Sequence, residues 1–106
     1  MATYRADGWT ALGDPTRRAI FERVAEQPRA VVELASELPV SLPAVSQHLK
    51  VLKEAGLVVD RPVGNRRIYQ LDPAGLEALR SQLDRFWTQA LANYKAAAEQ
   101  RTEEVS

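Results

Sequence analysis

Three neighbouring polar side chains, Ser46, Gln47 and His48, carry groups that can hydrogen-bond to nucleic acid. The carboxamide of Gln47 can pair in bidentate fashion with N6 and N7 of adenine in the major groove. Ser46 and His48 can donate or accept at a base edge or at a phosphate oxygen. Simpler alternatives stay open, because a helix glutamine is often only solvated and a single histidine is more often packed or solvated than a ligand.

Cationic side chains are concentrated in residues 41–67, where lysine and arginine exceed aspartate and glutamate by three. Lys50 and Lys53 stand three residues apart and could flank a phosphate, although an ordinary solvated face is the alternative. Arg66 and Arg67 follow a predicted turn, from which long cationic side chains can reach a minor groove or the phosphate backbone.

Phosphate can also be attracted by the first turn of a helix, where backbone amides are free. Thr16 and Arg17 occupy such a turn. Ser41 has a structural role as a helix cap, and Pro43 and Ala44 lie in the turn that follows it. The residues from which we expect DNA contacts are therefore Thr16, Arg17, Ser41, Pro43, Ala44, Ser46, Gln47, His48, Lys50, Lys53, Arg66 and Arg67.

Residues 41–56 are predicted to form the short helix that positions most of these groups. Ser41 can cap its start, and Gly56 can adopt the left-handed conformation that ends it. Apolar residues at spacings of four and three mark its inward side: Val45, Leu49 and Leu52. The side chains expected to point the opposite way are Ala44, Gln47 and His48.

A second short amphipathic helix is predicted at residues 31–38 and is joined to the first through Pro39 and Val40. The pair has the outline of a helix-turn-helix, whose second helix enters the DNA major groove. Two strand-like segments then flank residues 63–66, where Gly64 and Asn65 tolerate positive φ, so we expect a β-hairpin. A hairpin directly after a recognition helix is a wing.

Two further helices are predicted before the helix-turn-helix. Trp9 and Leu12 indicate a short docking helix. Asp14 and Pro15 then open a helix that ends before Pro28. Its expected inward stripe consists of Ile20, Phe21, Val24 and Ala25.

The longest predicted helix spans residues 73–98, and its apolar stripe runs for about 39 Å at 1.5 Å per residue. The rest of the chain is too small to cover this stripe, so we expect a second copy to bury it. The alternative is that the helix folds back onto the chain's own Trp9 and Leu12. The expected dimer interface consists of Trp9, Leu12, Leu79, Leu83, Phe86, Trp87, Ala90 and Tyr94. Residues 99–106 are expected to fray.

Composition excludes several functional classes. The 106 residues fit one domain, cysteine is absent and His48 is the only histidine, so we expect no metal site and no cofactor. No Gly-x-Ser-x-Gly motif or phosphate-binding glycine loop is present, so we expect no catalytic residues and no enzyme. Residues 1–5 lack a signal core and a myristoylation glycine, and no apolar run reaches a membrane span, so we expect a cytoplasmic protein that does not enter a membrane.

Four segments, residues 11–25, 32–35, 44–58 and 64–71, resemble the ArsR/SmtB family of winged-helix bacterial repressors. The resemblance implies a mainly α fold with a small β-hairpin, a winged helix-turn-helix and a homodimer formed through terminal helices. Within residues 1–106 it implies a single domain, with the helix-turn-helix at 31–56, the wing at 57–71 and the dimerisation helix at 73–98.

Many members of that family sense metals through a thiolate pair in the helix before the recognition helix. Here residues 33–37 contain no cysteine and the terminal helix contains no histidine, so the chain is most similar to the cysteine-free branch. Pro39 and Leu42 also depart from the family pattern, since these positions are frequently glycine and a polar residue.

The leading hypothesis is a dimeric transcriptional repressor whose partners are double-stranded operator DNA and a second copy. Two alternatives remain open. One is a winged-helix module for protein interaction, which a net charge of zero permits. The other is a sensor of an unknown small-molecule effector, in which Phe86, Trp87 and Tyr94 line a pocket.

Overall fold

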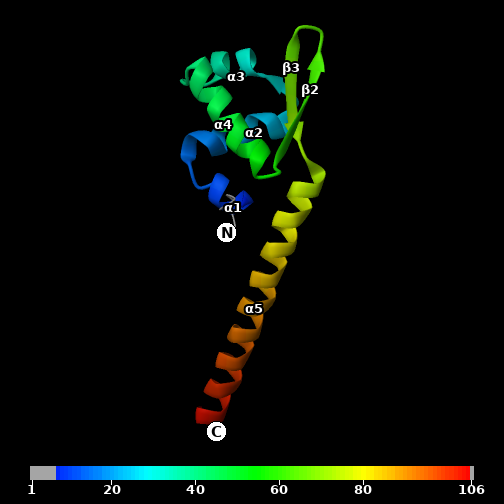
Figure 1. Ribbon diagram of the computed structural model, residues 1–106. Helices are drawn as coiled ribbons and strands as arrows, with labels where there is room; N and C mark the ends of the chain where they lie inside the picture. The colour runs from blue at the N-terminus through cyan, green and yellow to red at the C-terminus, as the bar shows by residue number, and fades with distance from the viewer. Residues whose placement is uncertain (1–6, 106) are drawn as a thin grey trace, which may run out of the picture.

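The computed structural model describes residues 7–105, so the N-terminal segment used for the signal and anchor argument lies outside the described residues. In residues 7–105, four helices lie in the globular part and the fifth extends from it as a long arm (Figure 1). In chain order the elements are α1 (Gly8–Ala11), α2 (Pro15–Glu26), β1 (Arg29–Ala30), α3 (Val31–Glu37), α4 (Leu42–Glu54), β2 (Val58–Val63), β3 (Arg66–Leu71) and α5 (Pro73–Val105).

Side-chain caps explain where three of the helices begin. Asp7 accepts a hydrogen bond from the Thr10 amide, Asp14 from the Arg17 amide and Ser41 from the Ala44 amide. Each bond satisfies an amide that the first turn of a helix leaves free. The caps at Asp14 and Ser41 confirm two of the predicted helix starts.

One hydrophobic core joins the elements of the globular part. Its largest fully buried side chains are Ile20, Val45, Leu34, Leu49, Leu52, Leu57 and Val58. The inward stripe predicted for α2 is correct at Ile20 and Val24, and Phe21 is half-buried, but Ala25 is exposed. Ala25 follows Val24 by about 100° around the helix, which takes it off the narrow face that α2 presents to the core.

The hairpin forms as expected and belongs to a three-stranded antiparallel sheet in the order β1-β3-β2. The register places Val63 opposite Arg66, so residues 64 and 65 form a two-residue turn. Gly64 has a φ of 64°, whereas Asn65 does not use the left-handed region. Positive φ at the first central residue alone is the pattern of a type II′ turn. Strand β1 has only two residues, too few for alternation to predict it.

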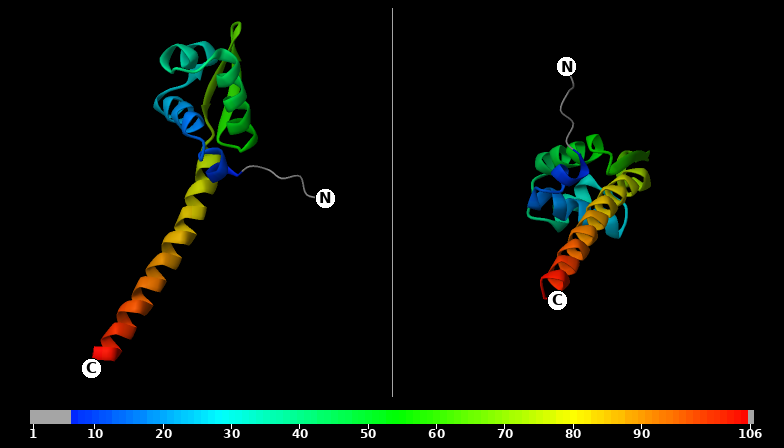
Figure 2. Two further views of the ribbon diagram at one scale, coloured as in Figure 1. Left: turned by 90° about the vertical axis from the view of Figure 1, so that its left-hand side faces the viewer. Right: turned by 90° about the horizontal axis from the view of Figure 1, so that it is seen from below.

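Helix α5 leaves the globular part at the end opposite the hairpin tip and extends far beyond it (Figures 1 and 2). Its 33 residues correspond to about 50 Å. The helix ends at Val105, so the end predicted at residue 98 and the fraying expected for residues 99–105 are wrong. Residues 99–103 are Glu, Gln, Arg, Thr and Glu, and they contain no glycine or proline to stop the helix.

Close approaches at two glycines tie the start of α5 to the globular part. A Cβ at Gly75 would overlap the Gly56 carbonyl oxygen, and one at Gly8 would lie 2.6 Å from Leu79. From Leu83 to residue 103 every residue of α5 is exposed. The alternative in which the stripe folds back onto α1 is therefore wrong from Leu83 to residue 103, whereas Leu79 does pack against α1.

Candidate nucleic-acid interface

Helix α4 divides into a buried seam and an exposed polar face. Val45, Leu49 and Leu52 are fully buried, as predicted. The exposed residues of α4 are Leu42, Pro43, Ser46, Gln47, Lys50, Lys53 and Glu54. At about 100° per residue they share an arc of roughly 140° with Ser46 and Lys50 near its centre and Gln47 at one edge. Most of this face is therefore open to solvent.

Ala44 and His48 do not point away from the core as predicted, because both are half-buried. They lie roughly 200° and 240° around the helix from Leu42, next to the seam and outside the exposed arc. His48 lies near Asp14 of the α2 cap: the pKa of Asp14 is lowered first by the Arg17 amide and, less strongly, by the charge of His48. The Nδ1 atom of His48 is buried without a hydrogen-bond partner in the described residues.

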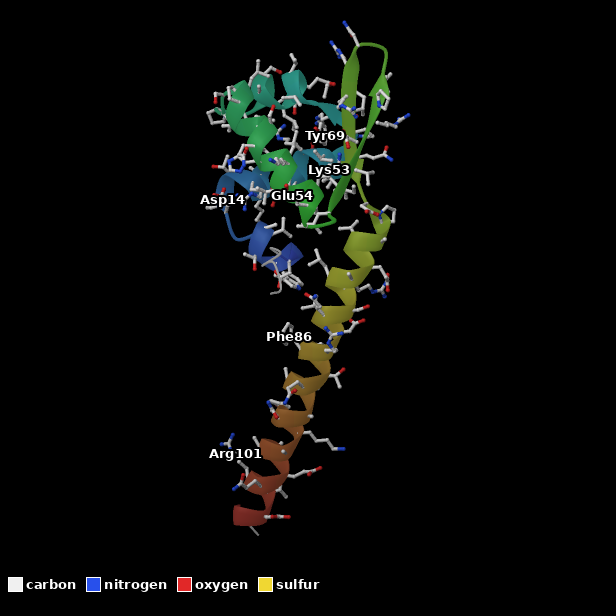
Figure 3. The ribbon with its side chains drawn as sticks, in the orientation of Figure 1. Asp14, Lys53, Glu54, Tyr69, Phe86 and Arg101 are labelled. Atoms are coloured by element: carbon white, nitrogen blue, oxygen red, sulfur yellow. The ribbon has the colours of Figure 1, made fainter. Side chains whose placement is uncertain are left out.

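A shared carboxylate connects α4 to the wing. The Lys53 ammonium lies 2.8 Å from Asp60, and the guanidinium of Arg67 donates to the same carboxylate at 2.9 Å. Figure 3 shows Lys53 between α4 and the hairpin. The Asp60 side chain is only 6% exposed, and its pKa is lowered chiefly by the hydrogen bond from Lys53. Lys53 and Arg67, two of the five lysine and arginine residues predicted to bind DNA, therefore share one acidic partner.

The two faces of the hairpin carry different cations. Alternation along the strands places Asp60 and Arg67 on the face toward α4, and Arg61 and Arg66 on the opposite face. Arg66 lies 3.9 Å from Glu33 of α3 and its side chain is 59% exposed. Arg61 is exposed, and within residues 7–105 it forms no ion pair within 4 Å. Arg61 was not among the residues predicted to contact DNA. The register of the hairpin places it on the same face as Arg66.

The first turn of α2 lies apart from the exposed face of α4. The Arg17 guanidinium is half-buried and donates to the Ala11 carbonyl oxygen at 3.2 Å, so it is turned toward α1. Thr16 lines a hollow together with Leu38, Pro39 and Val40, beside the turn before α4. Of these two, only Thr16 lies close to the start of α4.

The stripe along α5 is exposed over its outer part. The exposed fractions are 54% for Leu83, 67% for Phe86, 63% for Trp87 and 76% for Tyr94, and Ala90 is also exposed. Figure 3 shows Phe86 projecting from α5 below the globular part. Leu79 is half-buried against α1. Contiguous apolar surface of this kind marks a protein interface.

A hollow of about 360 Å³ lies between α1 and α2 and is lined by Trp9, Leu12, Arg18, Phe21 and Glu22. An exposed ion pair of 3.3 Å joins Arg18 to Glu22 at this hollow. Trp9 and Leu12 thus line this hollow, and their place in the dimer interface stays a prediction. Phe86, Trp87 and Tyr94 do not line it, and a small-molecule effector stays a prediction.

The described residues contain no group of three or more His, Cys, Asp and Glu side chains that could hold a metal ion. No helix in residues 7–105 is both long and apolar enough to cross a membrane.

Comparisons with known proteins agree with this geometry. A model of the helix-turn-helix domain HTH_20 matches residues 12–61. The chain is 68% identical over 96 residues to the HTH-type transcriptional regulator Rv2034 of Mycobacterium tuberculosis, which covers 89% of this chain and 90% of that protein. The solved structure of an ArsR-like transcriptional regulator from Rhodococcus sp. RHA1 is 33% identical and covers 85% of this chain and 88% of its own, with a TM-score of 0.71. The chain belongs to the ArsR/SmtB family.

As a member of the ArsR/SmtB family it is a DNA-binding transcriptional regulator with a winged helix-turn-helix. The winged helix-turn-helix domain Mb0332 from Mycobacterium bovis is described as homodimeric; it is 28% identical and covers 80% of this chain and 74% of its own, with a TM-score of 0.62. The absence of cysteine fits the cysteine-free branch of the ArsR/SmtB family.

Proposed function

We propose that two copies of this chain pair through α5 and act as a repressor in the cytoplasm, with each α4 reading one half of an inverted repeat. The observation that carries the proposal is the separation of the two exposed surfaces. The hairpin tip lies at one end of the globular part and α5 leaves from the other (Figure 1), and the exposed polar residues belong to α4 whereas the exposed apolar stripe belongs to α5.

This placement lets one molecule use both surfaces at once. Pairing along α5 buries Leu83, Phe86, Trp87 and Tyr94, which are more than half exposed in the single chain. Because the α5 contact lies away from the hairpin tips, it leaves both recognition helices free. Two such helices related by a dyad fit half-sites about 34 Å apart, or one turn of DNA.

Base reading and backbone binding are assigned to different residues. Ser46 and Gln47 are exposed on α4 and carry the hydrogen-bonding groups that base edges require. Lys50, Arg61 and Arg66 supply exposed positive charge for phosphates, and Lys53 and Arg67 contribute less because Asp60 already binds both. Thr16 and Ser41 lie beside the start of α4 and can contact the adjacent phosphate.

The test is a mobility-shift titration of the purified protein with DNA from upstream of its own coding region, at physiological salt. We expect one complex with the mass of a dimer on DNA, and tighter binding than to a scrambled duplex of the same length and composition. Equal affinity for both duplexes would disprove sequence-specific DNA binding. A folded monomer that binds DNA as a monomer would disprove pairing through α5.

A further inference from the structure

The first turn of α4 lacks the hydrogen-bonding side chains that base recognition normally uses. The Ser41 hydroxyl accepts from the Ala44 amide at 3.3 Å and so serves as the cap. Leu42 and Pro43 follow with purely apolar side chains, and Ala44 is half-buried. The N-terminal residues of a recognition helix are nevertheless the ones that contact base edges. The exposed side chains of this turn, Leu42 and Pro43, can therefore offer base edges only apolar contact.

Leu42 borders the buried seam but is only about half covered. It lies about 20° around the helix from Leu49, yet its side chain is 48% exposed whereas Val45, Leu49 and Leu52 are fully buried. It lies on the exposed arc of α4, within roughly 40° of Ser46 and 20° of Lys53. A large apolar side chain therefore sits on the face that the proposed function gives to the major groove.

One feature of the major groove matches such a side chain. Every base presents hydrogen-bonding groups there, but only thymine adds an apolar C5-methyl group. We propose that Leu42 is a specificity-determining residue that packs against a thymine methyl group in each half-site. This inference rests on the proposed function, since it needs α4 in the major groove. It goes further by naming thymine as the base that the first turn of α4 selects.

The experiment replaces each thymine of the operator half-site, one at a time, by deoxyuridine, which removes the methyl group and keeps base pairing. Affinities are measured by fluorescence anisotropy for the full-length wild-type protein and for Leu42→Ser. At one or two thymines per half-site we expect uracil to weaken wild-type binding by about fourfold, the effect of losing one buried methyl group. At these positions Leu42→Ser should bind thymine and uracil equally.

Val32→Ser is the matched control, because Val32 is an apolar residue in the first turn of α3 and is 60% exposed. It should keep the wild-type discrimination between thymine and uracil. Circular dichroism and thermal unfolding check that Leu42→Ser folds.

The inference is overturned if no uracil weakens wild-type binding, a result that does not depend on any variant. It is also overturned if Leu42→Ser keeps the full discrimination. Both results are interpretable only if the wild-type protein binds the operator more tightly than scrambled DNA. If it binds both equally, the proposed function itself is wrong.

Discussion

The ammonium group of Lys53 in α4 lies 2.8 Å from the nearly buried carboxylate of Asp60 in β2. Arg67 of β3 binds the same carboxylate at 2.9 Å. Three elements, α4 and both strands of the hairpin, therefore meet at one charged group. Two of the cations near α4 are thus already paired with a carboxylate before any phosphate binds.

The Asp60 contact predicts a pH dependence of stability. Because the pKa of Asp60 is below its ordinary value of 3.8, chiefly through the Lys53 hydrogen bond, its contribution is complete above that value and is lost as pH falls through the folded pKa. We expect Asp60→Asn to lower the free energy of unfolding at pH 7. We also expect this free energy to fall less in Asp60→Asn than in wild type as the pH is lowered from 5. Urea unfolding followed by circular dichroism measures both effects. Asp7 and Asp14 are present in wild type and variant alike, so stability curves that stay parallel over this pH range would contradict the prediction.

Gln47 and Arg66 should affect DNA binding differently. Gln47→Ala is expected to cost about 1–3 kcal/mol of operator binding and to relax the preference at one base pair per half-site. Arg66→Ala is expected to weaken all duplexes and to reduce the salt slope by about one per lost phosphate contact. Anisotropy titrations at several salt concentrations separate the two effects. Gln89→Ala on the exposed side of α5 is the control and should change neither quantity.

Trp87→Glu should convert the dimer into monomer or aggregate. An unpaired charge buried in an apolar interface costs several kcal/mol, and Leu83→Glu should act in the same way. Ala92→Glu is the matched control, because Ala92 lies on the side of α5 opposite Leu83 and is exposed. Sedimentation velocity at micromolar concentration provides the measurement. A folded wild-type monomer under these conditions would refute the interface.

Operator binding should be independent of metal and redox state. Selective zinc or copper sites need several convergent thiolate or imidazole ligands, and this chain has no cysteine and one histidine. Chelators, zinc, copper and peroxide should each change operator affinity by less than about threefold, below the roughly 5–150-fold range of allosteric coupling. A stoichiometric zinc ion whose removal changes the affinity tenfold would falsify this.

Gly75→Ala should disturb the junction between α4 and α5. The new methyl group would overlap the Gly56 carbonyl oxygen, which is backbone and cannot move aside independently. We expect the free energy of unfolding to fall by about 1–3 kcal/mol, despite the better helix propensity of alanine. Ser81→Ala on the exposed surface of α5 should stay within about 0.5 kcal/mol of wild type. Equal denaturation midpoints for Gly75→Ala and wild type would show that the close approach is not needed.

Local signals in the sequence predicted much of the fold. The caps at Asp14 and Ser41, the seam of α4 and the Gly64 turn each depend on a few neighbouring residues, and all are confirmed. The end of α5 was predicted too early because helix propensity continues through polar residues after Ala98. The two-residue strand β1 depends on pairing with Tyr69 and Ile68, far away in sequence.

The site was less predictable from sequence because its charges pair across elements. Nothing local showed that Asp60 would bind Lys53 and Arg67 together, or that His48 would be half-buried. These arrangements depend on how the hairpin and α2 pack against α4. Conversely, the strand register found only after folding adds Arg61 to the cations that face solvent.

The close contact between Gly56 and Gly75 places the pivot of α5 directly after the end of α4. About 45 Å of helix lies beyond Gly75, so a tilt of 5° at the junction moves the far end by about 4 Å. If two copies pair along α5, any ligand or mutation that slightly changes the angle between α5 and the globular part also changes the distance between the two copies of α4. Since operator half-sites have a fixed spacing, a change of angle at this glycine pair would alter how well the two copies of α4 fit them.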